Sequence, residues 1–153
     1  MTALFSTFKI KDITLKNRIG MAPMCQYSAV DGVMNDWHRS HLGARAMGGA
    51  ALIICEATAV SPDGRITPGC TGLWNEKQME AVAPINAFIK SLGAVPAIQI
   101  GHAGRKGSAH VPWDGGAHIP DNDPVGWPTI SPTSQAFDAD GTRLWKEPHE
   151  MSI

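Results

Sequence analysis

The hydrophobic and polar positions of the chain change their period several times, and each change predicts a new element. Residues 8–15 alternate apolar and polar positions around a Lys-Asp pair, which is typical of a small β-hairpin with strands at Phe8–Ile10 and Thr14–Leu15. Strands that are apolar on both faces are usually parallel and covered on both sides. Three later runs have this character, and we predict buried parallel strands at residues 19–24, 50–60 and 94–102.

Two segments between these strands have helical signals. Residues 35–49 begin at Asn35 or Asp36, either of which can cap the first amides, and end at Gly48–Gly49. Residues 75–93 begin at Asn75, with Gln78 at the spacing of a capping box. The second helix has one apolar stripe, formed by Met79, Val82, Ile85, Phe88, Ile89 and Leu92. Pro84 interrupts it, so we expect a kink or a start later than Asn75.

This order of hairpin, strand, helix, strand, helix and strand predicts a parallel α/β architecture. A doubly wound sheet and a (β/α)8 TIM barrel both fit the pattern, although no GxGxxG follows the first strand, which weakens the dinucleotide-fold interpretation. Three strands and two helices are too few to close a barrel, which takes about 200 residues or more. We therefore expect the chain to be a fragment, or to work only beside a complementary chain.

Residues 102–148 have a different composition. They hold six of the eleven prolines and six of the sixteen glycines, and an irregular stretch of this length is usually a lid or a binding loop. We expect a loop excursion after the third strand, with short strands inside it. The last residues, EPHEMSI, resemble the first turn of another helix.

The composition excludes several classes of partner. The net charge is −1 and the basic residues are scattered, so neither nucleic acid nor an acidic membrane surface is favoured. The N-terminus lacks the uninterrupted apolar core of a signal peptide, and no run approaches the roughly 20 apolar residues of a membrane span. Three cysteines without CxxC spacing favour reduced thiols and a cytoplasmic protein.

Polar side chains cluster just after the predicted strands, where α/β proteins place their chemistry: Cys25 and Tyr27, then Glu56 and Thr58, then Gln99 and His102. Cys25 could be a nucleophile with His102 as its base, or a small buried hydrophobe. Cys55 is expected in the core, and Cys70 has no evident partner.

Charged and metal-binding alternatives are weaker. Glu56 is costly to bury unless paired, and we expect a structural salt bridge to Arg105 or Lys106. His38 and His41 share a helix face as HxxH, but no third ligand lies at a metal-site spacing, so His41 is expected to be hydrogen-bonded in a packed helix.

Three stretches closely resemble the old yellow enzyme family: LKNRIGMAPMCQYSA, DWHRSHLGARAMGGAALIICEATAVSPDGRITPGCTGLWNE and PAIQIGHAGRK. The MCQY motif resembles the bacterial ene-reductase branch that carries a cysteine at the flavin and includes the xenobiotic reductases. The resemblance implies that residues 1–153 are the N-terminal portion of a single (β/α)8 TIM barrel domain whose bottom is closed by the hairpin. It also implies non-covalent FMN at the barrel mouth, with NADPH or NADH as reductant and an activated C=C bond, as in enones, as hydride acceptor.

The resemblance also implies roles for individual residues. Cys25 lies near the reactive flavin nitrogen and tunes its potential, and Tyr27 contacts substrate, so we expect both to be catalytic. Ala57 lets the ring approach closely, Gln99 bonds its pyrimidine edge, and Arg105 is structural or lines the mouth. The first FMN-contacting segment corresponds to Ala22, Pro23, Met24 and Cys25.

The resemblance thus predicts an FMN-dependent oxidoreductase that acts on a small-molecule enone. We expect this chain alone to be inactive. Two alternatives remain open. The chain could be a non-catalytic half-barrel that binds flavin or self-associates, as a homo-oligomer or with a complementing C-terminal half. A metal-dependent lyase on a barrel is the third possibility.

Overall fold

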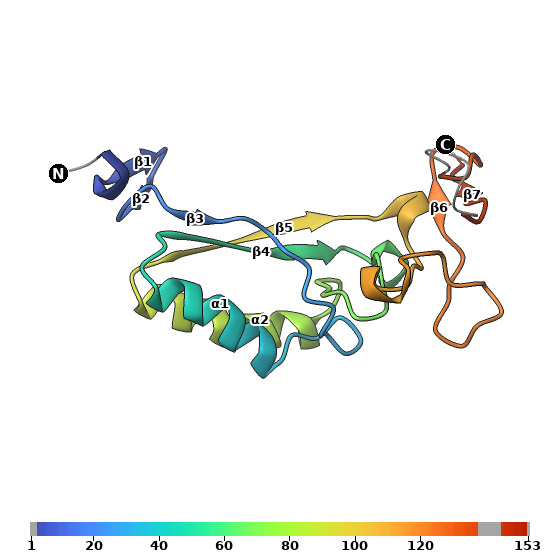
Figure 1. Ribbon diagram of the computed structural model, residues 1–153, viewed down its shortest axis with the longest axis horizontal. Coiled ribbons are helices and arrows are strands. Elements are labelled where there is room, and N and C mark those ends of the chain that lie inside the picture. The colour runs from blue at the N-terminus through green and yellow to red at the C-terminus, as the bar shows by residue number, and fades with distance from the viewer. Residues whose placement is uncertain (1–2, 138–144, 153) are drawn as a thin grey trace.

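The computed structural model describes residues 3–137 and 145–152, and its centre is a parallel sheet. The strands are β3 (Gly20–Met21), β4 (Leu52–Ala59) and β5 (Val95–Gly101), in the order β3-β4-β5 (Figure 1). The apolar residues of β4 suit its central position, between two neighbours. β3 is shorter than the six residues predicted, because the backbone leaves β4 after Met21 and Pro23 has no N–H to continue the ladder.

Helices α1 (Asp36–Met47) and α2 (Glu76–Ser91) lie side by side on one face of this sheet (Figure 1). Capping boxes begin both of them, with Asn35 and His38 at α1 and Asn75 and Gln78 at α2. α2 therefore starts directly after Asn75, and the later start considered from Pro84 is wrong. No helix in the described residues is long and apolar enough to cross a membrane.

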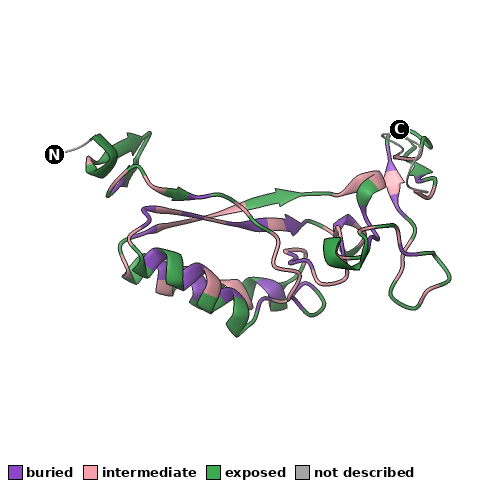
Figure 2. Ribbon diagram, viewed as in Figure 1, coloured by how far each residue is buried: buried purple, intermediate pink, exposed green. Residues whose placement is uncertain are grey.

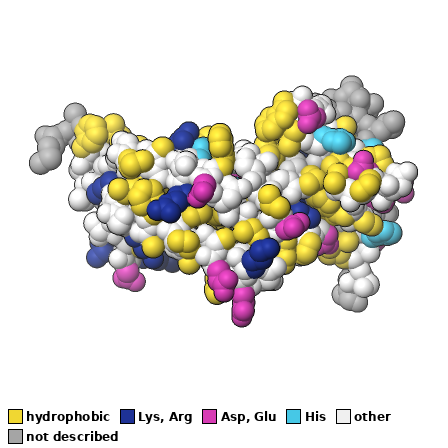
Figure 3. Space-filling view, turned by 90° about the horizontal axis from the view of Figure 1, so that it is seen from below, with side chains coloured by type: hydrophobic (Ala, Val, Ile, Leu, Met, Phe, Trp, Pro, Cys, Tyr) yellow, Lys and Arg dark blue, Asp and Glu magenta, His cyan; other side chains and the backbone are white. Residues whose placement is uncertain are grey.

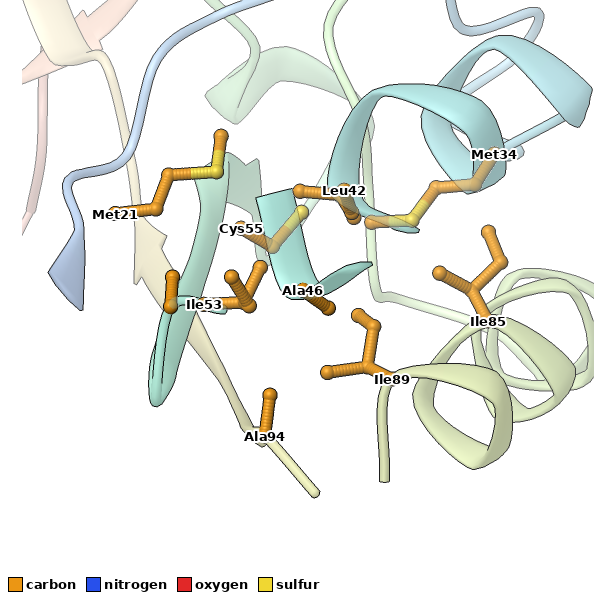
Figure 4. Packing of buried hydrophobic residues seen from close by; sticks show 10 residues of the cluster. Met21, Met34, Leu42, Ala46, Ile53, Cys55, Ile85, Ile89 and Ala94 are labelled. Atoms are coloured by element: carbon orange, nitrogen blue, oxygen red, sulfur yellow. The ribbon is translucent and has the colours of Figure 1, made fainter. Parts of the chain in front are cut away.

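The core lies between the helices and the inner face of the sheet. Ile53 of β4 and Ile89 of α2 are each only 1% exposed, and the Cys55 side chain lies among them (Figure 4). Cys55 is thus a core residue, as predicted. The expected stripe of α2 is wrong at Met79, which is 55% exposed. The buried cluster consists of Met21, Met34, Leu42, Ala46, Ala50, Ile53, Cys55, Ile85, Ile89 and Ala94.

Strands β4 and β5 differ in how far their residues are exposed to solvent. The C-terminal part of β5 is exposed at Gln99, Ile100 and Gly101, whereas most of β4 beneath it is buried (Figure 2). On the side seen in Figure 3, acidic and basic side chains are interspersed with hydrophobic ones, which agrees with the balanced composition.

A hairpin precedes the sheet. Its strands β1 (Phe8–Ile10) and β2 (Ile13–Leu15) pair antiparallel. It follows a 3-10 turn at Ala3–Phe5 and lies at the opposite end of the molecule from the last strands (Figure 1). Further 3-10 turns occupy Pro62–Gly64, Gly104–Lys106 and Pro112–Asp114.

The chain after β5 forms a second small sheet, in which β6 (Ile130–Ser131) pairs parallel with β7 (His149–Glu150). The helical turn expected at EPHEMSI is therefore wrong at residues 149–150. The backbone N–H of His149 donates to Thr129 and that of Met151 donates to Ser131, so these amides join a ladder instead of starting a helix. Residues 138–144 of the predicted excursion lie outside the described residues.

Candidate functional site

The ends of β4 and β5 frame a cavity. Ala57 and Gln99 are opposite each other in the parallel ladder, so their side chains leave the same face of the sheet. The cavity has a volume of about 200 Å³ and continues along the turn after β4. It is lined by small residues and by the polar groups of Thr58, Arg65, Gln99 and His102. This end of the sheet can therefore receive a planar ligand with an edge that forms hydrogen bonds.

A β-bulge in β4 shapes this end of the sheet. Cys55 is opposite Ile98, and the next residue with a partner is Ala57, so Glu56 is the extra residue in the ladder. Alternation breaks at this point, and Cys55 and Glu56 are both buried although they are consecutive. The hydroxyl of Thr58 donates to the Glu56 carbonyl at 2.8 Å, which satisfies the irregular backbone.

The carboxylate of Glu56 is 2% exposed and bonds the loop after β3. Its Oε2 accepts the backbone N–H of Gln26 at 2.9 Å, and its Oε1 lies 3.4 Å from Nε2 of His38. The salt bridge expected with Arg105 or Lys106 is therefore wrong.

Those two cations lie elsewhere. Arg105 donates to the hydroxyl of Thr133 at 3.2 Å, and the Lys106 ammonium lies 3.9 Å from the centroid of the Phe137 ring. The carboxylate is closer in the chain to helix α1, which supplies His38, than to the excursion that carries these cations.

Cys25 lies in the loop after β3, next to Ala57 of β4. Its half-buried thiol receives a backbone hydrogen bond from Ala57, whose ladder partner is Gln99. A hydrogen bond to Cys70, burial and the charge of Glu56 together raise the pKa of Cys25 above its ordinary value. Cys25, Ala57 and Gln99 are thus neighbours, in that order, around one end of the sheet. The Cys25 thiol keeps its proton there.

Cys70 has the partner that the sequence did not reveal. Its buried sulfur interacts with Cys25 and accepts from the backbone N–H of Thr67 at 3.4 Å, with the Thr67 hydroxyl at the same distance. Hydrogen bonds from Cys25 and Thr67 lower the pKa of Cys70 to about 6. The two thiols therefore differ in character, Cys25 holding its proton and Cys70 favouring the thiolate.

Tyr27 is held in an unusual backbone conformation. Its φ is 53°, in the left-handed region that residues with a side chain rarely adopt. Its ring packs edge-to-face on Trp113, with centroids 5.4 Å apart and planes at 81°. Burial is the largest cause that raises the pKa of the Tyr27 phenol, followed by the neighbouring Cys25. The hydroxyl therefore stays protonated and can donate a hydrogen bond.

The other residues predicted to contact flavin lie along the segment that leaves the sheet. Ala22 and Met24 are exposed and Pro23 is half-buried, and none of the three is among the described residues that line the cavity. The Met24 carbonyl accepts the side-chain amide of Gln26 at 2.9 Å.

Histidine chemistry receives little support. His102 lies 3.8 Å from the Asp63 carboxylate and accepts the N–H of Gly104 at 3.0 Å, so its described partners belong to the turns and not to Cys25. The expected hydrogen bond of His41 is wrong at Nε2, which is buried without a partner among the described residues. Within residues 3–137 and 145–152, no three His, Cys, Asp or Glu side chains converge as a metal site.

Reasoning from sequence missed three features of this site. They are the bulge at Glu56, the Cys25–Cys70 pair, and Gly69, which lies against the backbone of Tyr27. All three depend on contacts between distant segments. The TPGCTG motif was the available signal, because Gly69 and Cys70 stand together in a loop that returns to residues 25–29; the Gly69 carbonyl accepts the N–H of Ala29 at 2.9 Å.

Comparison with known proteins identifies the family. A model of the NADH:flavin oxidoreductase / NADH oxidase family matches residues 3–143. An NADPH dehydrogenase of Bacillus cytotoxicus is 42% identical over 139 residues, which are 90% of this chain and 40% of the relative. An NADPH dehydrogenase of Listeria welshimeri is 50% identical over 108 residues, covering 69% of this chain and 32% of the relative. The chain thus spans about 40% or less of the length of these curated relatives.

Solved structures agree. The old yellow enzyme homologue of Zymomonas mobilis matches 99% of this chain and 40% of its own, with a TM-score of 0.77 and 27% identity. Such neighbours are TIM barrels, so the sheet described above is consistent with part of a barrel. Family members use FMN, with NAD(P)H as the reductant. The chain belongs to the NADH:flavin oxidoreductase / NADH oxidase family and is of the old yellow enzyme type.

Proposed function

We propose that the full-length protein carrying this chain is an FMN-dependent ene-reductase, which takes hydride from NAD(P)H and delivers it to the activated C=C bond of small molecules such as enones. The observation that carries the proposal is the succession of Cys25, Ala57 and Gln99 around one end of the sheet. Family membership supports the flavin and the reductant.

The residues present fit FMN at this end of the sheet. Ala57 has no side chain beyond Cβ, so a planar ring can lie against β4, and the exposed amide of Gln99 offers both a donor and an acceptor to its edge. Backbone groups of the segment Ala22–Cys25, which lies outside the lining of the cavity, would meet the ring from the loop after β3, and the cavity beside Ala57 provides room for the ring. When bound, FMN supplies the hydride-transfer chemistry.

In this proposal Cys25 contacts the flavin and Tyr27 contacts the substrate. The Cys25 thiol, kept protonated by its surroundings, contacts the ring and tunes its potential. The Tyr27 hydroxyl, on the same loop, contacts substrate and donates a hydrogen bond to its activating oxygen. The reduced thiols of Cys25, Cys55 and Cys70 support a cytoplasmic location.

The experiment is purification of the full-length protein followed by NADPH oxidation with cyclohexenone. The proposal predicts a yellow protein that consumes NADPH only when the enone is added under anaerobic conditions. Gln99→Leu removes the amide and should weaken FMN binding, whereas Gln135→Leu, at an exposed position after β6, should leave it near wild-type. A folded, colourless protein that does not bind added FMN would contradict the proposal.

A second candidate is a half-barrel that binds flavin or itself without catalysis. Exposed large apolar side chains at the open end of the sheet, such as Ile100 at 62% and Met24 at 47%, favour this alternative for the 153-residue chain. Size-exclusion chromatography with FMN titration separates the two. A discrete oligomer that binds FMN without turnover supports the half-barrel, and aggregated material supports simple dependence on the rest of the barrel.

A further inference from the structure

The buried carboxylate of Glu56 has no part in the proposed chemistry, yet the fold directs it at the loop that carries Cys25 and Tyr27. The bulge in β4 turns Glu56 inward where regular alternation would turn it out. Its Oε2 accepts the N–H of Gln26 at 2.9 Å. Gln26 stands between Cys25 and Tyr27, so this one bond fixes the backbone on which both side chains depend.

A carboxylate that is 2% exposed is costly to keep ionised unless donors surround it. The Gln26 N–H is one such donor, and His38, itself 1% exposed, lies against the other carboxylate oxygen. Nδ1 of His38 lies 3.1 Å from both the backbone nitrogen and the side-chain oxygen of Asn35, so its donor or acceptor role depends on the tautomer. Nε2 of the ring lies 3.4 Å from Oε1 of Glu56 but has no hydrogen bond among the described residues. The start of helix α1 therefore orients the imidazole, and the imidazole faces the carboxylate.

Helix α1 holds the same loop at a second point. The indole N–H of Trp37 donates to the side-chain oxygen of Gln26 at 3.0 Å, and the Gln26 side-chain nitrogen donates to the carbonyl of Met24 at 2.9 Å. The main chain of Gln26 is bonded to β4 and its side chain to α1, so the loop has little freedom to move relative to the sheet.

We propose that Glu56 is a positioning residue that fixes the Met24–Tyr27 loop against β4 and thereby sets the reactivity of the Cys25 thiol beside the flavin. The inference rests on the proposed function, because the loop matters to catalysis only if it meets FMN and substrate. The charge acts at short range inside the protein, where solvent screens it poorly. Cys70 and Tyr27 are the other titratable groups that face Cys25.

The test is Glu56→Gln in the full-length protein, which keeps an oxygen for the Gln26 N–H and removes the charge. Alkylation of Cys25 by iodoacetamide is followed at peptide level by mass spectrometry. Loss of the charge lowers the pKa of Cys25, so alkylation at pH 8 should become roughly three- to tenfold faster. In FMN-loaded protein the flavin midpoint potential should also rise, since a nearby negative charge disfavours the anionic reduced ring.

Glu80→Gln is the matched control, because Glu80 is exposed on α2 and its variant should alkylate like wild-type. If the Glu56→Gln protein does not fold, the Cys25 alkylation rate of His38→Gln tests the proposal in its place. Glutamine keeps the capping box, as Gln78 does in α2, but removes the imidazole that faces the carboxylate; the loop is then held less firmly, and Cys25 should react faster, by a smaller factor.

An unchanged Cys25 alkylation rate in a folded Glu56→Gln or His38→Gln protein would overturn the inference and leave Glu56 a purely structural residue. The thiol measurement needs no flavin. A full-length protein that fails to bind FMN but shows the faster Cys25 alkylation would therefore refute the proposed function alone.

Discussion

The carbonyl group of Tyr27 occupies the space in which a side chain on Gly69 would lie. A Cβ built on Gly69 falls 2.8 Å from the Tyr27 carbonyl carbon, closer than real Cβ contacts come, and the atoms it meets are backbone. Tyr27 has a positive φ of 53°, so the loop that carries it is already strained. The two segments are joined by the bond from the Ala29 N–H to the Gly69 carbonyl, and they must move together.

Gly69→Ala should therefore displace the Tyr27 loop. We expect a loss of about 1–3 kcal/mol in the free energy of unfolding, the usual range for overpacking, together with a raised KM for the enone. Thermal and urea unfolding of the full-length protein measure the first effect and steady-state kinetics the second. Gly20→Ala is the control, since its Cβ would meet Leu52 at an ordinary 3.6 Å. Wild-type stability and KM in Gly69→Ala would contradict this account of the loop.

The α2 helix offers a second matched pair. Ile89 is 1% exposed in the core and Met79, earlier on the same helix, is 55% exposed. Ile89→Ala should lower the free energy of unfolding by about 2–5 kcal/mol, because it leaves a cavity between α2 and the sheet. Met79→Ala should change it by less than about 0.5 kcal/mol. Urea denaturation measures both, and equal effects would show that the helix packs through a different face.

Much of the architecture follows from local sequence. The Asn75–Gln78 box starts α2 where predicted, and the continuous apolar run of β4 indicates its central parallel position. β3 could not be predicted to end at Met21 from hydrophobicity alone, because MAPM is as apolar as a strand and only the ladder with β4 defines its end. The last residues pair with β6 because Ile130 lies beside them in space, which no local pattern reveals.

The candidate site also contains features that local sequence predicts and features that it does not. A polar cluster that includes Cys25, Glu56 and Gln99 could be expected at one edge of the sheet because parallel strands end there, whereas the role of Ala57 came only from the family resemblance and stays a prediction. The partner of Glu56 could not be predicted, because a bulge reverses the side on which its side chain lies, and a bulge has no simple sequence signature here. The sequence suggested Arg105 as the partner of Glu56 because of its positive charge. In the structure, His38 of α1 lies beside the carboxylate instead.

The thiol pair predicts a dependence of stability on pH. Cys70 has a pKa of about 6 in the folded protein against an ordinary 9.0, so its contribution is fully present above 9.0 and is lost as the pH falls toward 6. The difference in unfolding free energy between wild-type and Cys70→Ser should therefore shrink from pH 9 to pH 6, as measured by urea denaturation in reducing buffer. Cys25, whose pKa is raised, contributes in the opposite sense, and its share is lost only above 9.0.

Cys55→Ala provides the comparison for this experiment. The pKa of Cys55 is raised to about 12, mainly by burial, so its contribution is constant below 9.0. The offset between wild-type and Cys55→Ala should not vary from pH 6 to pH 9. An offset for Cys70→Ser that is equally flat would mean that Cys70 keeps its proton in the folded protein.

The central claim is that FMN lies against Ala57 between Cys25 and Gln99, and FMN affinity of Ala57→Leu in the full-length protein tests it most directly. A leucine at this position would stand where the ring lies, so fluorescence titration should show FMN affinity reduced at least about a hundredfold, equivalent to about 2.7 kcal/mol. Ala44→Leu on the exposed face of α1 should bind FMN like wild-type. Wild-type FMN affinity in a folded Ala57→Leu protein would contradict the claim.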